Sequence, residues 1–200
     1  MQIKTNIKVI FFLFTILFGC QNTKKKHITK TTFGKQKGSD SPGAELVYDK
    51  YYNWGDIIKE TERMVCNDSI PKITLKFNHE IKTIYFHNPC WEDFGCILIK
   101  AKNTIEIHND TIIKNHQNFY PLDSLKAVLK RDLENNGKIP NLSDSPKKFL
   151  IYISYDKNKF ENFPKTLDKL TQAYQHVTNK TDINIWLNKR LNIPPPPPIN

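Results

Sequence analysis

The chain has 200 residues, with 30 lysines and arginines against 20 aspartates and glutamates, a formal net charge of +10. Eight of the lysines lie in residues 1–44 and two of the carboxylates, Asp40 and Glu45, lie in residues 1–45, so the remaining body of 22 basic and 18 acidic residues is close to +4. The length suits one domain with an elaboration, and the charge pattern gives no basic groove, so we expect no nucleic-acid partner.

The first residues have the pattern of an export signal. Lys4 and Lys8 precede a short apolar run, Val9 to Phe18. About 20 apolar residues are needed to cross a bilayer, whereas a charged segment followed by a short apolar segment is typical of a secretory signal. Residues 17–20 then read Leu-Phe-Gly-Cys.

This stretch resembles the lipobox of bacterial lipoproteins. The resemblance implies a signal peptide over residues 1–19, cleavage after Gly19, and acylation of Cys20, with palmitate among the chains. Two or three acyl chains anchor a protein stably. We therefore predict an anchor in the cell membrane or outer membrane, with the body in the periplasm or at the cell surface. Phe18 is bulkier than the lipobox pattern has, so an uncleaved signal anchor stays open.

Residues 20–45 are predicted to form a flexible basic tether behind the lipidated cysteine. The segment carries six lysines together with glycines, serines and a proline. Such a composition buries too little apolar surface to offset conformational entropy. Its lysines either remain solvated or contact anionic lipid headgroups.

Three further cysteines follow, Cys66, Cys90 and Cys96. An exported domain permits a disulfide, and three cysteines allow one intramolecular bridge. The short spacing favours Cys90 with Cys96, and Cys66 with either partner stays open. No CxxC spacing is present, so we expect no zinc or other metal site.

Residues 46–96 are predicted to be an N-terminal elaboration made of a helix and a hairpin. A weak helical pattern covers Tyr48 to Met64. Two stretches rich in β-branched and aromatic residues, 73–77 and 81–86, are separated by a turn sequence, which indicates a β-hairpin.

Residues 97–190 are predicted to form an α+β domain, a small mixed sheet with two helices packed on one face. Strands are expected at 97–100, 104–108 and 111–113, a helix with a leucine stripe at 121–135, a buried strand at 149–155, a second helix at 163–177 and a last strand at 183–187. The tail, 191–200, contains five consecutive prolines, either a polyproline ligand or a passive terminus.

This order of elements resembles the periplasmic domain of the ExbD/TolR biopolymer-transport family. The stretch that carries the resemblance is Ile151-Tyr152-Ile153-Ser154-Tyr155-Asp156-Lys157, followed by Phe160. It implies interaction residues at Asp156, Lys157 and Phe160. Asp156 can also be read as a turn or capping residue.

Two departures limit this resemblance. The apolar stretch over residues 9–19 contains no acidic residue, although family members carry a titrating aspartate in their membrane helix, so proton coupling is not implied. Residues 46–96 also have no counterpart in the family.

No GxSxG, HExxH or phosphate-binding glycine motif is present. We therefore expect a non-enzymatic binding module without a cofactor, with an envelope protein or peptidoglycan as partner. The alternative is an exported metal-binding protein or hydrolase that uses histidines and carboxylates around positions 79–116. Its candidate residues are His79, His87, Glu92, Asp93, His108 and His116.

Overall fold

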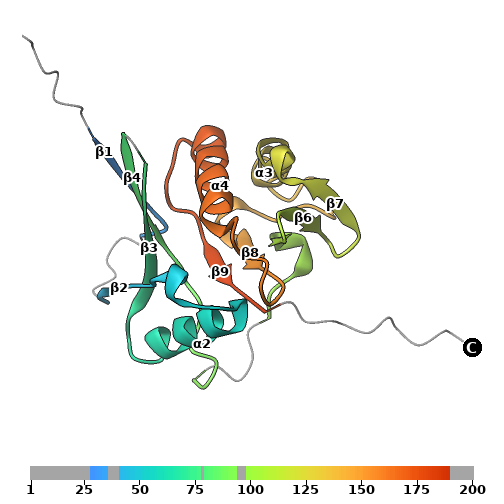
Figure 1. The fold of residues 1–200 in the computed structure, drawn as a ribbon. Coiled ribbons are helices and arrows are strands. Elements are labelled where there is room, and N and C mark those ends of the chain that lie inside the picture. Colours follow the sequence, from blue (N-terminus) through green and yellow to red (C-terminus); the bar gives the residue numbers. More distant parts are fainter. Residues whose placement is uncertain (1–27, 36–40, 78, 94–97, 190–200) are drawn as a thin grey trace, which may run out of the picture.

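The computed structural model of the chain describes residues 28–35, 41–77, 79–93 and 98–189, and within them the fold is α+β, as predicted. A four-stranded and a five-stranded sheet, both mixed, pack with three α-helices (Figure 1). No helix in these ranges is long and apolar enough to cross a membrane. Cys20 and the proline-rich tail lie outside the described residues.

The four-stranded sheet, called sheet A, has the order β1-β4-β3-β2. Its strands are β1 (Thr29–Phe33), β2 (Gly43–Glu45), β3 (Ile70–Lys76) and β4 (Glu80–Tyr85). Strands β3 and β4 form the predicted hairpin, while β1 and β2 add to its two edges in parallel.

Strands β1 and β2 correct the prediction of a tether over residues 20–45. Phe33, at the end of β1, is fully buried in the core. Thr29–Phe33 is rich in β-branched residues but has a single large apolar side chain, so its strand character comes from pairing with β4 almost 50 residues later. Residues 29–33 and 43–45 are therefore part of the folded body.

The five-stranded sheet, called sheet B, has the order β7-β6-β5-β8-β9. Its strands are β5 (Thr104–His108), β6 (Thr111–Lys114), β7 (Asn118–Pro121), β8 (Leu150–Ser154) and β9 (Ile185–Leu187). Four of these strands were predicted, and β7 was not. The strand expected at 97–100 is wrong for residues 98–100, which have no regular structure.

Both predicted helices lie on one face of sheet B. These are α3 (Leu125–Leu133), preceded by a 3-10 turn at Leu122–Ser124, and α4 (Phe163–Thr178). The facing rows of the sheet are aliphatic and fully buried: Ile105, Ile151 and Ile185 in one row, and Ile107, Ile153 and Leu187 in the next. Alternation along the strands sends these side chains to the helix side.

A buried ion pair fixes α3 over β6. The Lys114 ammonium contacts the carboxylate of Asp132 and also donates to the carbonyls of Lys102 and Thr104. Both charged side chains are buried, and burial lowers the pKa of Lys114 while the Asp132 carboxylate opposes that shift. A pair of this kind stabilises only while both partners are present.

The two sheets meet at the end of β4. After Tyr85 the chain continues along β9: the His87 amide donates to the Ile185 carbonyl at 2.9 Å, and the Asn88 side chain bonds both the N–H and the carbonyl of Leu187. Gly34 occupies the junction with φ +75°, where a Cβ would lie 2.8 Å from the Tyr85 carbonyl oxygen. The His87 ring donates to the Gly34 carbonyl.

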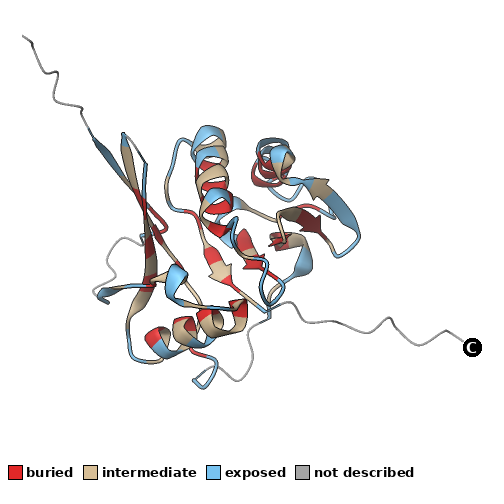
Figure 2. Cartoon of the chain, in the orientation of Figure 1, coloured by how far each residue is buried: buried red, intermediate tan, exposed pale blue. Residues whose placement is uncertain are grey.

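Helix α4 lies in the angle between the two sheets (Figure 1). Lys82 of β4, 2% exposed, forms an ion pair with Asp168 of α4 at 2.6 Å. Buried segments of both sheets and of α4 face one another (Figure 2) and form one hydrophobic core from Phe33 to Leu187. The elaboration predicted at 46–96 and the domain predicted at 97–190 therefore share a single core.

The predicted lead-in helix is α2 (Trp54–Val65), which follows a 3-10 turn at Tyr48–Lys50. Asn53 caps it by accepting a hydrogen bond from the Asp56 amide. The Trp54 ring packs edge-on against Tyr155 and Phe163, and its Nε1 donates to the Asn188 carbonyl at 2.7 Å. Trp54 thus closes the open end of the core.

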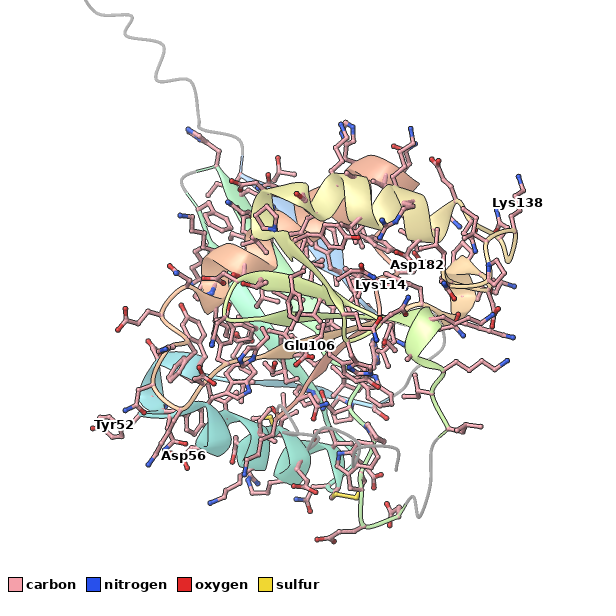
Figure 3. All side chains as sticks on the ribbon, turned by 90° about the vertical axis from the view of Figure 1, so that its right-hand side faces the viewer. Tyr52, Asp56, Glu106, Lys114, Lys138 and Asp182 are labelled. Carbon is pink, nitrogen blue, oxygen red and sulfur yellow. A yellow bond between two sulfur atoms is a disulfide. The ribbon has the colours of Figure 1, made fainter. Side chains whose placement is uncertain are left out.

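The disulfide joins Cys66 to Cys90, with Cα atoms 4.9 Å apart, which corrects the favoured pairing of Cys90 with Cys96. The bond lies near the C-terminal end of α2 (Figure 3). Packing of α2 on β3 brings its end to the segment after β4, so the fold overrides proximity in sequence. Cys96 lies outside the described residues.

Replacing Cys66 by alanine is expected to lower the free energy of unfolding by about 3 kcal/mol, because the bridge closes a loop in the unfolded chain. Cys96→Ala is the control and should leave stability unchanged. Denaturant unfolding under non-reducing conditions measures both. A loss with Cys96→Ala and none with Cys66→Ala contradicts the pairing.

Burial lowers the pKa of His87 below its usual 6.5, against a smaller opposing effect of its bond to the Gly34 carbonyl. The unfolded chain therefore binds a proton at a higher pH than the folded one, and stability should fall as pH drops through 6.5 towards the lowered value. His87→Gln should flatten this part of the stability profile, while exposed His176→Gln should not. Parallel profiles for His87→Gln and the parent contradict the assignment.

Candidate functional site

The candidate site is the face of sheet B that points away from α3 and α4. Strand pairing places one residue from each strand in a single row across this face. In sheet order the row is Phe119, Ile113, Glu106, Tyr152 and Trp186. With strands about 4.8 Å apart, the row is roughly 20 Å long. We call it the outward row.

The outward row is aromatic at both ends. Trp91, which follows the disulfide cysteine Cys90, places its ring 6.1 Å from that of Trp186, and Trp186 lies 5.9 Å from Tyr152, both edge-on. Trp91 is 48% exposed, and Phe119 at the other end is 60% exposed. The disulfide thus holds an exposed tryptophan at the end of the row.

Two polar groups at the β9 end of the row have no hydrogen-bond partner among the described residues. They are Nε1 of Trp186 and Oδ1 of Asn184, both buried. The two residues are two apart on the chain, so both point to the outward side at β9. Buried polar groups without partners are uncommon in folded proteins. At this end of the row, the described residues therefore leave one hydrogen-bond donor and one acceptor without a partner.

The centre of the row is polar. Ser154 donates its hydroxyl proton to the Glu106 carboxylate at 2.8 Å and accepts from Nδ1 of His108 at 2.9 Å. The side chain of Asn109 contacts Nε2 of His108 at 3.1 Å and donates to the Asp156 carboxylate at 2.7 Å. The network ties together the ends of β5 and β8, which run parallel and terminate side by side.

A serine, a histidine and a carboxylate in contact invite comparison with a hydrolase, but the geometry does not present a nucleophile. Ser154 is fully buried. Its proton is directed at Glu106, and the imidazole acts as a donor to its oxygen rather than as a base. A nucleophile needs both an adjacent base and access to the substrate. This cluster therefore acts as a structural bond between strands.

The three residues implied by the family resemblance make different contacts in the structure. Asp156 is exposed and accepts from Asn109, in a turn rather than a helix cap. The Lys157 carbonyl accepts from the Trp54 amide at 2.9 Å, and the Phe160 ring packs against Trp54. The Lys157 backbone and the Phe160 ring thus hold the start of α2, while the Lys157 side chain is exposed next to Asp156.

The histidines proposed for the alternative function are not brought together. His79 lies next to the β3–β4 turn, His116 lies in the β6–β7 turn, His87 bonds Gly34, and His108 bonds Ser154. Glu92 and Asp93 are exposed in the loop after Cys90. In residues 28–35, 41–77, 79–93 and 98–189, no three histidines, cysteines or carboxylates are placed to hold a metal ion.

A shallow hollow of about 190 Å³ lies beside the start of α4. Asp110, in the left-handed conformation at the β5–β6 turn, accepts from Tyr155, Thr166 and Asn162. Lys169 pairs with Asp123 at 2.6 Å across the hollow. The charged groups that line the hollow are thus engaged within the chain. Their hydrogen bonds and the ion pair stabilise the junction between the β5–β6 turn and α4.

Comparison with known proteins gave no match to a family model, a curated protein or a solved structure. The function has to be argued from this chain alone. Sequence reasoning missed Trp91, Glu106, Phe119, Tyr152 and Trp186 as site residues. The alternation of apolar and polar residues in 104–108 and 183–187 is a signal that could have placed Glu106 and Trp186 opposite the core side. The register that aligns them across strands is not visible in the sequence.

Proposed function

We propose that this chain is a lipid-anchored, non-enzymatic protein of the bacterial cell envelope that binds another envelope protein through the outward row of sheet B. The observation that carries the proposal is the row itself. It has exposed aromatic rings at both ends, and α3 and α4 both lie on the opposite face. Trp and Tyr are the residues that dominate protein–protein binding energies.

The anchor is supported by residues 1–20 and by where the body begins. Because β1 starts at Thr29, the segment between Cys20 and the sheet has eight residues. Fully extended, these reach about 28 Å. The body is thus tethered close to the membrane that holds the acyl chains, which suits a partner in the same envelope layer.

The chemistry of the row favours a protein over a glycan as partner. Phe119 offers exposed apolar surface without hydrogen-bonding groups, Ile113 beside it is buried, and Glu106 already accepts from Ser154. The aromatic rings of Trp91, Trp186 and Tyr152 pack edge-on to one another and do not form a flat stacking platform. Apolar, aromatic surface with few charges is typical of the centre of protein interfaces.

We further propose that residues 104–187 are related to the periplasmic domain of the ExbD/TolR family. Two helices on one face of a mixed sheet is the arrangement that the resemblance implies, and α3 and α4 lie in this way on sheet B. Strands β1–β4 and helix α2 are additions with no counterpart. The proposed relation concerns binding within the envelope and includes no proton coupling.

Site-specific photo-crosslinking in the host cell tests the proposal. A photoreactive amino acid is placed at Trp91 or Phe119, and at Tyr52 as the control. Tyr52 is 92% exposed and projects from the surface ahead of α2 (Figure 3). Positions 91 and 119 should give the same discrete, protease-sensitive adduct, and position 52 should give none. Radioactive fatty acid should label the same chain and be lost in Cys20→Ala.

Three results would contradict the proposal. An adduct released by a peptidoglycan hydrolase would identify a glycan partner. Equal adducts at position 52 would show that the row has no preference. Fatty-acid label persisting in Cys20→Ala would remove the lipid anchor.

A further inference from the structure

The outward face of sheet A is basic. The core side of this sheet carries Phe33, Ile73 and Ile84, so the alternate residues point away from α4. Strand pairing places Lys30 of β1, Ile81 of β4 and Lys76 of β3 in one outward row. A second outward row pairs Tyr85 with Lys72, whose ammonium lies over the Tyr85 ring. Between them lies a row of three threonines, Thr32, Thr83 and Thr74.

Among the outward positions of the four strands, one carboxylate, Glu45 of β2, opposes these three lysines. Both of its oxygens are engaged by Thr74, through the amide at 2.7 Å and the hydroxyl at 3.1 Å. Glu45 also lies beside Lys72 in the register. Lys30 and Lys76 are both exposed, and no carboxylate at an outward position of the four described strands lies beside them.

One exposed apolar side chain lies on the same side of the sheet as those lysines. Ile28, just before β1, is 50% exposed. Phe77, just after β3, is 43% exposed but continues the core-side alternation of β3, and the Lys82 ammonium lies over its ring. Thr29 pairs with Glu80, and the Phe77 amide donates to the Glu80 carbonyl, so both apolar residues lie at the same end of sheet A. This is the end at which the chain enters the fold (Figure 1).

We propose that this end and the outward face of sheet A rest on an anionic lipid surface. Lysines beside exposed apolar residues are the pattern of a protein surface that sits at a membrane interface. Residues 21–39, which include β1, contain no acidic residue. The orientation rests on the proposed lipid anchor, but the lipid contact itself needs no acyl chain.

This placement leaves the outward row of sheet B free. The two sheets face different directions around α4 (Figures 1 and 2). Sheet A can lie on the membrane while Trp91 and Phe119 remain open to a partner. Residues 21–28, which reach at most about 28 Å, would keep sheet A near the lipid headgroups if Cys20 is acylated.

Vesicle sedimentation tests the lipid contact with the unacylated chain, residues 21–200, which keeps every helix and strand described. We expect binding to vesicles that contain about one third anionic lipid, little binding to neutral vesicles, and release at high salt. Each lysine near the surface contributes about fivefold, so Lys30→Gln with Lys76→Gln should weaken binding about 30-fold. Ile28→Ala should weaken it as well.

The matched control is Lys147→Gln with Lys148→Gln. Both lysines are exposed, and they lie in the turn before β8, far along the chain from sheet A. This variant carries the same loss of charge and should bind as the parent does. Thermal unfolding checks that each variant is folded.

Equal weakening by both double variants would show a response to net charge alone and overturn the proposal. Equal binding to neutral and anionic vesicles, or no binding, would do the same. Either result leaves the crosslinks at positions 91 and 119 untouched, so the lipid contact and the proposed function fail separately.

Discussion

Helix α4 has apolar residues on more than one side, and the fold buries them by placing the helix in the angle between the two sheets. Phe163 and Tyr155 pack together on the side of sheet B, while Asp168 meets Lys82 of sheet A on another side. Of the buried positions of α4, four are large and apolar: Phe163, Leu167, Leu170 and Tyr174. Removing either sheet would expose this surface to water, at roughly 25 cal/mol per Å².

Because α4 lies in the angle between the sheets, each sheet has one face that does not contact the helix. The helices occupy the angle, so each sheet has one side committed to the core and one side turned outwards. Sheet B presents the outward row, which ends at Trp186 beside Trp91, and sheet A presents lysines with Ile28 beside them. The same packing constraint thus produces two surfaces with different chemistry, one suited to a protein and one to lipid.

Periodicity predicts the elements whose pattern is local. The leucine stripe of α3, the stripe of α4, the apolar run of β8 and the hairpin β3–β4 are all present near their expected positions. Strand β1 was missed because Thr29–Phe33 gains its order from distant β4, and a polar strand of this kind reads as a linker. The Cys66–Cys90 bond was not favoured because the helix that brings its ends together is a tertiary effect.

The candidate site was less predictable than the fold. Trp91 and Trp186 are nearly 100 residues apart and meet only because the segment after β4 runs along β9. The resemblance predicted interaction roles for Asp156, Lys157 and Phe160. In the structure, the Lys157 carbonyl and the Phe160 ring both contact Trp54. A residue's role at a strand end depends on what covers that end, and a helix from the N-terminal third of the chain covers this one.

The central claim is that residues 29–189 form one cooperative unit built around α4. Native-state hydrogen exchange tests it most directly, by comparing amides of Ile84 in sheet A, Leu170 in α4 and Ile151 in sheet B. All three should exchange with the same free energy, and Phe33→Ala should lower that value equally at each, by about 3–5 kcal/mol. Exchange of Ile84 at a much lower free energy, with Ile151 unaffected by Phe33→Ala, would contradict the account.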